Sequence, residues 1–481
     1  MPPTPPWAAG LPADLQAGAA ESSVALAELL ASGDTPAFTI ARAIENNAAW
    51  CSLPEGGIGA CLQLASQLVD QPSTRPALEL AWHIWRLLFP NAAGSADAIQ
   101  SEYGPTPAAA LPAVLPPLGA QTPTMYLLLL LGGVDQLLAQ HARRGIPERV
   151  TRDTLSDIAV WTRANYTGGL NPLSTRSGGE QDEPPSGVWG LENLGWPMRT
   201  MSGELLRIGR LQHRLDTHTQ PFSVYRERGG ARRVRVVCAE PGVAFDSAGI
   251  RCEAAAESDG IWLSQKHEQP DGASLLVTGI DGSSGLAIRE PLTELAPLSD
   301  WELLLQPGDK VLEMHIPEDG PMGLEAVAAG MRDAAAYWDS WYPTVPRESS
   351  EAGGPLGEEG LLNPLFKVFT CTSWMLDPEY QRRLSPRSNV VRLQKACHLF
   401  PLSGSGGPAS GYERIFSGPD RRLTCEPREG DTSMQAAFLA HLRSGGRWVG
   451  GGAVVLADEI DQFGRAEESG GAVGPAAAAT L

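Results

Sequence analysis

Two apolar segments end in side chains that could transfer protons. The run Val311–Ile316 carries Glu313 and His315, and a later run that begins at 366 ends in Cys371 and Ser373. If both runs are strands, each pair lies on one face, because side chains two residues apart in a strand point the same way. Glu313 and His315 then offer a general base. Cys371 and Ser373 offer an acid for a leaving group or, as the alternative, a nucleophile.

Both pairs also have an ordinary structural interpretation. His315 could be a hydrogen-bonded histidine at a strand end beside a solvated Glu313, and Cys371 could be a small buried apolar residue. Polar residues at strand ends are nevertheless where binding loops and catalytic groups concentrate. If the two strands are neighbours, we expect His315 and Cys371 to face one cleft.

Several cationic and amide side chains could bind the phosphates of a co-substrate. Guanidinium groups bind phosphate well, but in an acidic chain they also pair with carboxylates. The arginines of 202–214 share a face only if that segment is helical, which its pattern does not decide. The alternation in Ser388–Gln394 predicts a half-buried strand whose polar face could bind a ligand or simply be exposed. The candidates are Arg207, Arg210, Asn389, Arg392 and Gln394.

The chain has no clear loop for a pyrophosphate. Two matches to the pattern [QR]-x-x-G-x-[GA] occur, at Arg226–Ala231 and Arg447–Gly452, but neither precedes an evident helix. The turn Pro317–Gly323 does stand between a strand and a helix, as a phosphate site should. Its Glu318 and Asp319 would repel a phosphate, which favours simple helix capping.

Composition narrows the classes of partner. The net charge of −19 opposes binding to nucleic acid and to anionic membranes. The longest apolar block, Met125–Leu131, is shorter than the roughly 20 residues of a membrane span, and no secretory signal is evident at the N-terminus. The seven cysteines are scattered without a C-x-x-C pair, and the histidines form no ligand cluster. We therefore expect no metal, no disulfide framework and a reducing cytoplasm.

The elements that position these residues change in kind near residue 200. Before it, helical periodicity dominates; after it, strand-like runs alternate with helices, which is typical of an α/β or α+β domain. The expected helices are Ala20–Ala31, Ala77–Phe89, Met125–Arg144, one from Thr151 through Trp161, Leu324–Trp341 and Ser433–Leu442. The expected strands are Arg233–Cys238, Leu275–Thr278, Val311–Ile316, Phe366–Cys371, Cys397–Leu402 and Val449–Leu456.

Several segments, in one order, resemble a bacterial acyltransferase-domain family. They are G-I-P-E-R-V-T-R-D-T-L-S-D-I (145–158), S-G-E-L-L-R-I-G-R-L-Q (202–212), M-H-I-P-E-D-G-P (314–321), C-T-S-W-M-L-D-P (371–378), S-N-V-V-R-L-Q (388–394) and D-T-S-M-Q-A-A-F-L-A-H-L-R-S-G-G-R-W (431–448). Together they extend across roughly residues 50–457. The chain departs from the family at Thr372, where a histidine often stands.

The resemblance implies an all-helical N-terminal domain of the N-acyltransferase type followed by a GNAT-like mixed-sheet domain. We expect an Ala/Pro-rich segment with one helix at 1–50, the helical domain at 51–167, a linker at 168–199, the GNAT-like domain at 200–457 and a disordered tail at 458–481. The implied function is acyl transfer from acyl-CoA, such as acetyl-CoA, to an unknown small-molecule amine or hydroxyl. The alternative is a catalytically silent module that binds a ligand or a protein.

Overall fold

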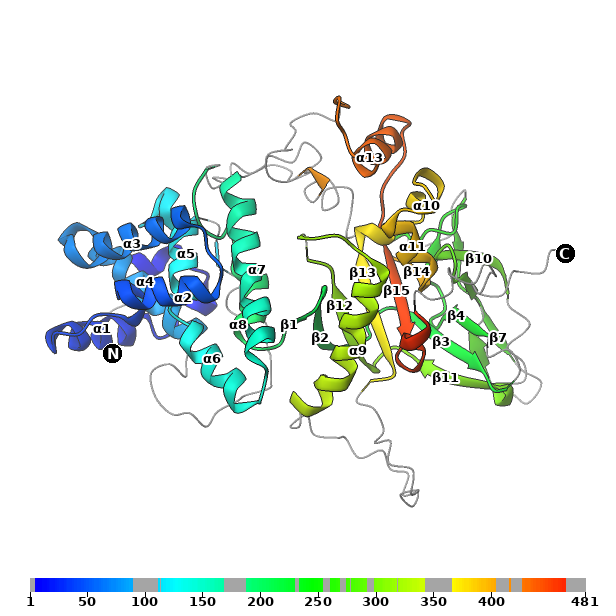
Figure 1. Ribbon diagram of the computed structural model, residues 1–481, viewed down its shortest axis with the longest axis horizontal. Helices are drawn as coiled ribbons and strands as arrows, with labels where there is room; N and C mark the ends of the chain where they lie inside the picture. Colours follow the sequence, from blue (N-terminus) through cyan, green and yellow to red (C-terminus); the bar gives the residue numbers. More distant parts are fainter. Residues whose placement is uncertain are drawn as a thin grey trace, which may run out of the picture. The chain divides into compact units, whose positions relative to one another are not determined.

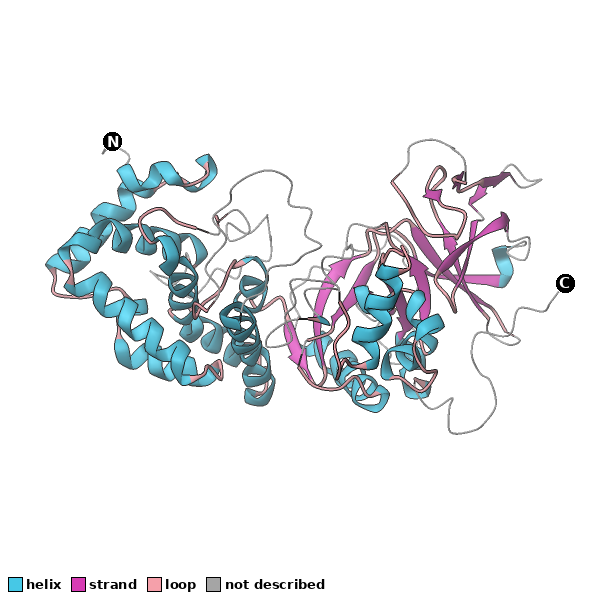
Figure 2. Ribbon diagram, turned by 90° about the horizontal axis from the view of Figure 1, so that it is seen from above, coloured by secondary structure: helices cyan, strands magenta, loops and turns pink. Residues whose placement is uncertain are grey.

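A computed structural model describes residues 5–89, 111–112, 114–167, 187–229, 233–253, 260–268, 274–276, 278–291, 298–317, 319–341, 366–403, 415–416 and 426–463. The chain forms two compact units, and the main division between them lies between Arg207 and Ile208. The first unit is helical and the second is built on sheets (Figures 1 and 2). The predicted order, an all-helical domain followed by a mixed-sheet domain, is confirmed.

The helical unit is built around a fully buried helix, α5. All residues of Thr122–Leu131 are buried, so its apolar run is the centre of a packed core. The helices of this unit are α1 (Ala19–Ala31), α2 (Ala41–Trp50), α3 (Glu55–Asp70), α4 (Arg75–Leu88), α5 (Thr122–Leu131), α6 (Val134–Arg143), α7 (Glu148–Thr167) and α8 (Gly195–Met201). By length and composition Gly119–Arg143 could cross a membrane, but 72% of that stretch's most apolar window is buried, as in the core helix of a folded unit.

Three boundaries in this unit differ from those expected. The predicted helix Met125–Arg144 is divided in two at Gly132 and Gly133. A Cβ at Gly132 would lie 2.6 Å from Phe38 Cβ, and one at Gly133 would lie 2.2 Å from the ring of Phe89. The segment 1–50 contains α2 as well as α1, and the expected linker 168–199 contains α8.

The second unit has two main sheets. The larger, sheet A, has the order β1-β2-β12-β13-β15-β14, and sheet B has the order β10-β9-β4-β3-β11. The strands of sheet A are β1 (Leu206–Ile208), β2 (Leu211–Thr217), β12 (Lys310–His315), β13 (Val368–Ser373), β15 (Gly451–Leu456) and β14 (His398–Pro401). Those of sheet B are β10 (Leu286–Pro291), β9 (Thr278–Asp281), β4 (Val234–Cys238), β3 (Phe222–Glu227) and β11 (Trp301–Leu305). Two short hairpins complete the set: β5 (Ala244–Phe245) with β6 (Trp262–Leu263), and β7 (Lys266–Glu268) with β8 (Ser274–Leu276).

The two faces of sheet A pack against different elements. On one face Val311, Val368 and Val454 join Phe222 and Val236 of sheet B in one hydrophobic core. The other face is covered by α9 (Leu324–Trp341), which lies in front of β12 and β13 in Figure 1 and packs against β2. The remaining helices of the unit are α10 (Glu379–Arg383), α11 (Asn389–Lys395) and α13 (Ser433–Arg443). The 3-10 turns used below are η10 (Trp374–Leu376) and η13 (Ala457–Gln462).

One predicted strand is wrong. Ser388–Gln394 forms the helix α11, and the hydroxyl of Ser388 caps it by accepting a hydrogen bond from the backbone N–H of Val391 at 3.3 Å. A run this short fits both an alternating strand and one face of a helix, and here the cap favours the helix. The ambiguous segment 202–212 contributes β1 and the start of β2 instead.

Candidate functional site

A cluster of charged side chains lies at the end of β12. Arg214 on β2 contacts Glu313 on β12, with 2.6 Å between Nη2 and Oε2, and it also pairs with Asp216. His315 Nε2 lies 3.2 Å from the same oxygen of Glu313, although not in hydrogen-bond geometry. The register explains the grouping, because Arg214 is opposite Glu313 and Gln212 is opposite His315 in the antiparallel ladder. The cluster is half-buried and therefore keeps some access to solvent.

The surroundings of Glu313 keep it ionised. Burial by itself raises the pKa of this carboxyl, but the neighbouring His315 and Arg214 outweigh burial and lower the pKa to about 2. A permanent carboxylate beside an imidazole stabilises the imidazolium that forms when the ring accepts a proton. Glu313 and His315 are thus brought together as predicted, in an arrangement suited to a general base.

The shared cleft expected for His315 and Cys371 is not found. Leu312 is in register with Phe369, and Glu313 with Thr370, in the parallel ladder of β12 and β13. Residues in register share a face, so Cys371, two beyond Phe369, lies on the opposite face from Glu313 and His315. Within each strand, the expected residues do share a face. The register between the two strands, however, places the pair on β12 and the pair on β13 on opposite faces of the sheet.

Cys371 lies in an apolar pocket under α9. Lining residues include Leu211, Met314, Val327 and Ala453. Cys371 is buried, and burial raises the pKa of its thiol. A neutral thiol in apolar surroundings is a weak acid and a weak nucleophile. These surroundings favour the interpretation of Cys371 as part of the pocket wall.

The pocket adjoins the place where the parallel ladder ends. The described pairs of that ladder stop at Glu313 and Thr370, whereas β12 continues to His315 and β13 to Ser373. Met314 and Cys371, the next residue on each strand, both line the pocket. Beyond this last pair, the two strands therefore have an apolar pocket on one face and the charged cluster on the other.

Ser373 has a structural partner. Its Oγ accepts a hydrogen bond from the backbone N–H of Met375 at 3.1 Å and caps the 3-10 turn η10. The turn leads to Asp377, which is buried and accepts hydrogen bonds from three backbone N–H groups, those of Glu379, Val449 and Gly450. The contacts with Val449 and Gly450 join residues about 70 positions apart in the sequence, which no local sequence pattern predicts.

The candidate phosphate ligands are engaged in structural contacts. Arg207 forms an ion pair with Asp157 at 2.8 Å. Arg210 donates to the backbone carbonyls of Pro317, Gly320 and Pro321, and so holds the loop that precedes α9. These contacts match the carboxylate and structural alternatives rather than phosphate binding.

The candidates on 388–394 are now placed on a helix. Gln394 is fully buried, and its Nε2 donates to the backbone carbonyls of Met375 and Asp377 at 2.7 and 3.0 Å. Asn389 and Arg392 are half-buried on the same helix, α11. Gln394 thus fixes the turn after β13, and the strand face proposed for these residues does not exist.

The glycine-rich matches are structural as well. Arg226 is ion-paired with Glu302 at 3.0 Å and with Asp458 at 2.6 Å. Gly451 and Gly452 begin β15, where a Cβ on Gly452 would lie 2.0 Å from the ring of Phe400. Residues 230–232 lie outside the described residues, and the next described element is the strand β4; the second segment leads into the strand β15.

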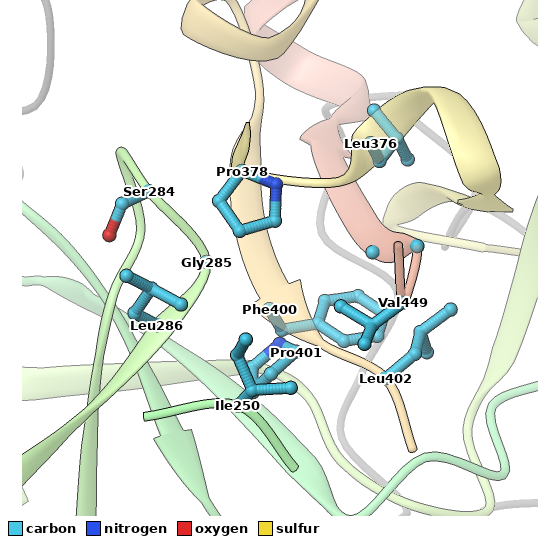
Figure 3. Close-up of a pocket in the computed structure, with 12 residues that line it drawn as sticks. Ile250, Ser284, Gly285, Leu286, Leu376, Pro378, Phe400, Pro401, Leu402 and Val449 are labelled. Carbon is cyan, nitrogen blue, oxygen red and sulfur yellow. The ribbon is translucent and has the colours of Figure 1, made fainter. Parts of the chain in front are cut away.

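A second small pocket lies where the β9–β10 turn meets β14. Figure 3 shows Ile250 and Val449 beside Phe400 and Pro401, with Ser284 across the space from them. It encloses about 10 Å³, which is close to the volume a single water needs. Among the described residues, no group of three His, Cys, Asp or Glu side chains is arranged to hold a metal ion.

His213 was not predicted as a notable residue. It is fully buried on the α9 face of β2, lies edge-on to Phe369 with 6.0 Å between ring centroids, and neither ring nitrogen has a hydrogen-bond partner among the described residues. Burial, helped by the charge of His315, lowers its pKa to about 3. Buried histidines without a hydrogen-bond partner are rare. The sequence does not indicate that His213 is buried, because its burial follows from the register that pairs it with Met314.

We expect His213→Leu to make the protein less sensitive to mild acid. The folded-state pKa lies below the unfolded value near 6.5, so the unfolded chain binds the extra proton and stability falls as pH falls below about 6.5. Between pH 7.5 and 5.5 this residue should account for about 1.4 kcal/mol of the loss. Urea unfolding at both pH values measures it. Gln212→Leu, on the other face, removes no titrating group and should leave the pH dependence unchanged. If His213→Leu lost as much unfolding free energy between pH 7.5 and 5.5 as the wild type, the lowered pKa of His213 would not be the cause of the acid sensitivity.

Comparison with known proteins identifies both units. Residues 205–455 match the model of the GNAT-like C-terminal domain, and residues 50–168 match that of the N-acyltransferase N-terminal domain. No curated protein matches the sequence significantly.

Solved structures with some similarity are acyltransferases. One is a complex with decanoyl-CoA and teicoplanin, at 16% identity and a TM-score of 0.49, covering 86% of this chain and 87% of that one. Another, a mutant with octanoyl-CoA, has 16% identity and a TM-score of 0.46 over the same shares of each chain. The match to residues 205–455 spans more than half of the sequence, and the chain therefore belongs to the family with a GNAT-like C-terminal domain.

Proposed function

We propose that the protein transfers an acyl group from an acyl-CoA thioester to a small-molecule amine or hydroxyl. The observation that carries the proposal is the end of the β12–β13 ladder, where the strands continue beyond their last described pair. A thioester placed between the strand ends is within reach of both faces of sheet A. The match to an N-acyltransferase N-terminal domain supports the same reaction.

In this reaction His315 removes the proton from the acceptor. The acceptor nitrogen or oxygen attacks the thioester carbonyl, its proton passes to the imidazole, and the carbon–sulfur bond breaks to release CoA thiolate, which takes a proton from solvent. Glu313 stabilises the imidazolium, and Arg214 holds the Glu313 carboxylate in place at 2.6 Å. The acceptor therefore approaches from the charged face.

The first turn of α9 is the proposed site for the CoA phosphates. The helix begins at Leu324, directly after the loop from β12, and the N-terminus of a helix carries a partial positive charge. The three carbonyl contacts of Arg210 fix that loop. Asp319 in the loop weakens the attraction for phosphate, so we expect pantetheine and acyl contacts to supply much of the affinity.

Calorimetric titration with decanoyl-CoA, acetyl-CoA, CoA and adenosine tests the proposal. We expect CoA thioesters to bind more tightly than adenosine, and release of free CoA thiol to accelerate when a panel of primary amines is added. Absence of binding at millimolar thioester, in folded protein, would overturn the proposal. Binding without any transfer to the amines would favour the alternative, a catalytically silent ligand-binding module.

A further inference from the structure

Among the described residues, the lining of the pocket under α9 consists of apolar residues and cysteines. Its walls come from the sheet, from the loop before α9, from α11 and from the end of η13. They include Leu211, Met314, Met322, Leu393, Cys397 and Phe463, together with Cys371. Such a lining suits a hydrocarbon chain, and none of the described side chains in it carries a charge.

The pocket runs across the strands. Leu211 lies on β2, Met314 on β12, Cys371 on β13 and Ala453 on β15, while Cys397 immediately precedes β14. This sequence of residues follows the order of sheet A from near one edge to the other. The end of the β12–β13 ladder therefore lies part of the way along the pocket, with β15 and β14 beyond it.

We propose that this pocket binds the hydrocarbon chain of a medium-length acyl group and that Cys397 and Leu393 limit its length. The inference rests on the proposed function, which places the thioester at the ends of β12 and β13. From there to β14 is roughly 10 Å at about 4.8 Å per strand, enough for a chain on the order of eight carbons. An acetyl group would leave most of this lining without contact.

The pocket must open to admit such a chain. In the structure it encloses about 20 Å³, room for about one water. Met314 and Met322 carry unbranched side chains with several rotatable bonds, so they can move aside at low cost. Met322 also belongs to the loop that leads to α9, which lets the same loop respond to CoA and to its acyl chain.

The two pocket cysteines provide a direct test of occupancy. Cys371 and Cys397 should react with decyl methanethiosulfonate faster than with the charged sulfonatoethyl reagent, and saturating decanoyl-CoA should slow the reaction at least tenfold while CoA does not. Peptide mass spectrometry resolves each site. Cys51, Cys61 and Cys238 are also buried, lie outside the pocket, and serve as internal controls whose labelling decanoyl-CoA should not change.

Acyl-chain preference gives the second readout. Cys397→Phe should lower the ratio of decanoyl-CoA to acetyl-CoA affinity by tenfold or more, since each methylene excluded costs about fourfold. If the bulky variant fails to fold, Leu393→Ala should instead extend the preference to longer chains, and Cys238→Val, at a buried cysteine outside the pocket, should retain the wild-type preference. Decanoyl-CoA could bind without protecting the two cysteines, and its affinity could be the same in these variants as in the wild type. The acyl chain would then lie elsewhere, and the inference would fail while the proposed function stands. If decanoyl-CoA does not bind at all, the proposed function fails first.

Discussion

Replacing His315 by glutamine should lower the rate of acyl transfer by about 10²–10⁴, the usual contribution of a positioned general base. The imidazole is the proposed base because Glu313, with a pKa of about 2, stays ionised and is paired with Arg214. Glutamine keeps a polar side chain of similar length but cannot accept the proton. Single-turnover release of CoA thiol, with decanoyl-CoA and a saturating amine, measures the effect.

The comparison with neighbouring variants separates catalysis from structure. Glu313→Gln should cause a smaller loss, since it removes the stabilisation of the imidazolium but leaves the base. Ser373→Ala should stay within about threefold of wild type, because its hydroxyl caps η10. Binding of decanoyl-CoA and the melting temperature should be unchanged in His315→Gln. Full activity in that variant would remove His315 from the mechanism.

The elements around the site were predictable because long apolar runs are strong local signals. The strand at 311–316 and the helix Leu324–Trp341 match β12 and α9 closely. Sheet B was largely missed, because its short strands carry charged residues such as Arg226 and Glu227 at positions that blur the alternation. That unrecognised sheet supplies the cover over one face of sheet A.

The relative placement of the candidate residues was not predictable. Alternation fixes which residues of one strand share a face, but the phase between two strands depends on register. Pairing of Leu312 with Phe369 turns Cys371 toward α9 and leaves His315 on the other face, whereas a shift of one residue would have put them together. Register depends on how both faces of the sheet pack against other elements. The sequence of a single strand carries no information about that packing.

The buried carboxylate of Asp377 shows how one side chain can join distant segments of this unit. Its Oδ2 accepts from the N–H groups of Val449 and Gly450 at 2.6 and 3.2 Å, and its Oδ1 accepts from Glu379 at 2.9 Å. The residue is 1% exposed. Burial raises the pKa of this carboxyl, while the three N–H donors oppose the shift. Through these hydrogen bonds, Asp377 connects the segment that follows β13 with the segment that precedes β15.

Asp377→Ala should therefore destabilise the second unit by about 4 kcal/mol, because it leaves three backbone donors without their acceptor and each unsatisfied buried group costs about 1–3 kcal/mol. Asp377→Asn keeps one acceptor oxygen and should cost about half as much. Asp309→Ala is the matched control: its carboxylate accepts one turn N–H, that of Gln306, at an exposed site and should contribute less than about 1 kcal/mol. Urea unfolding measures the three variants, and hydrogen exchange should show protection lost at the Val449 and Gly450 amides in Asp377→Ala. An Asp377→Ala protein as stable as Asp309→Ala, with those amides still protected, would show that the β13 and β15 segments are held together by strand pairing and side-chain packing alone.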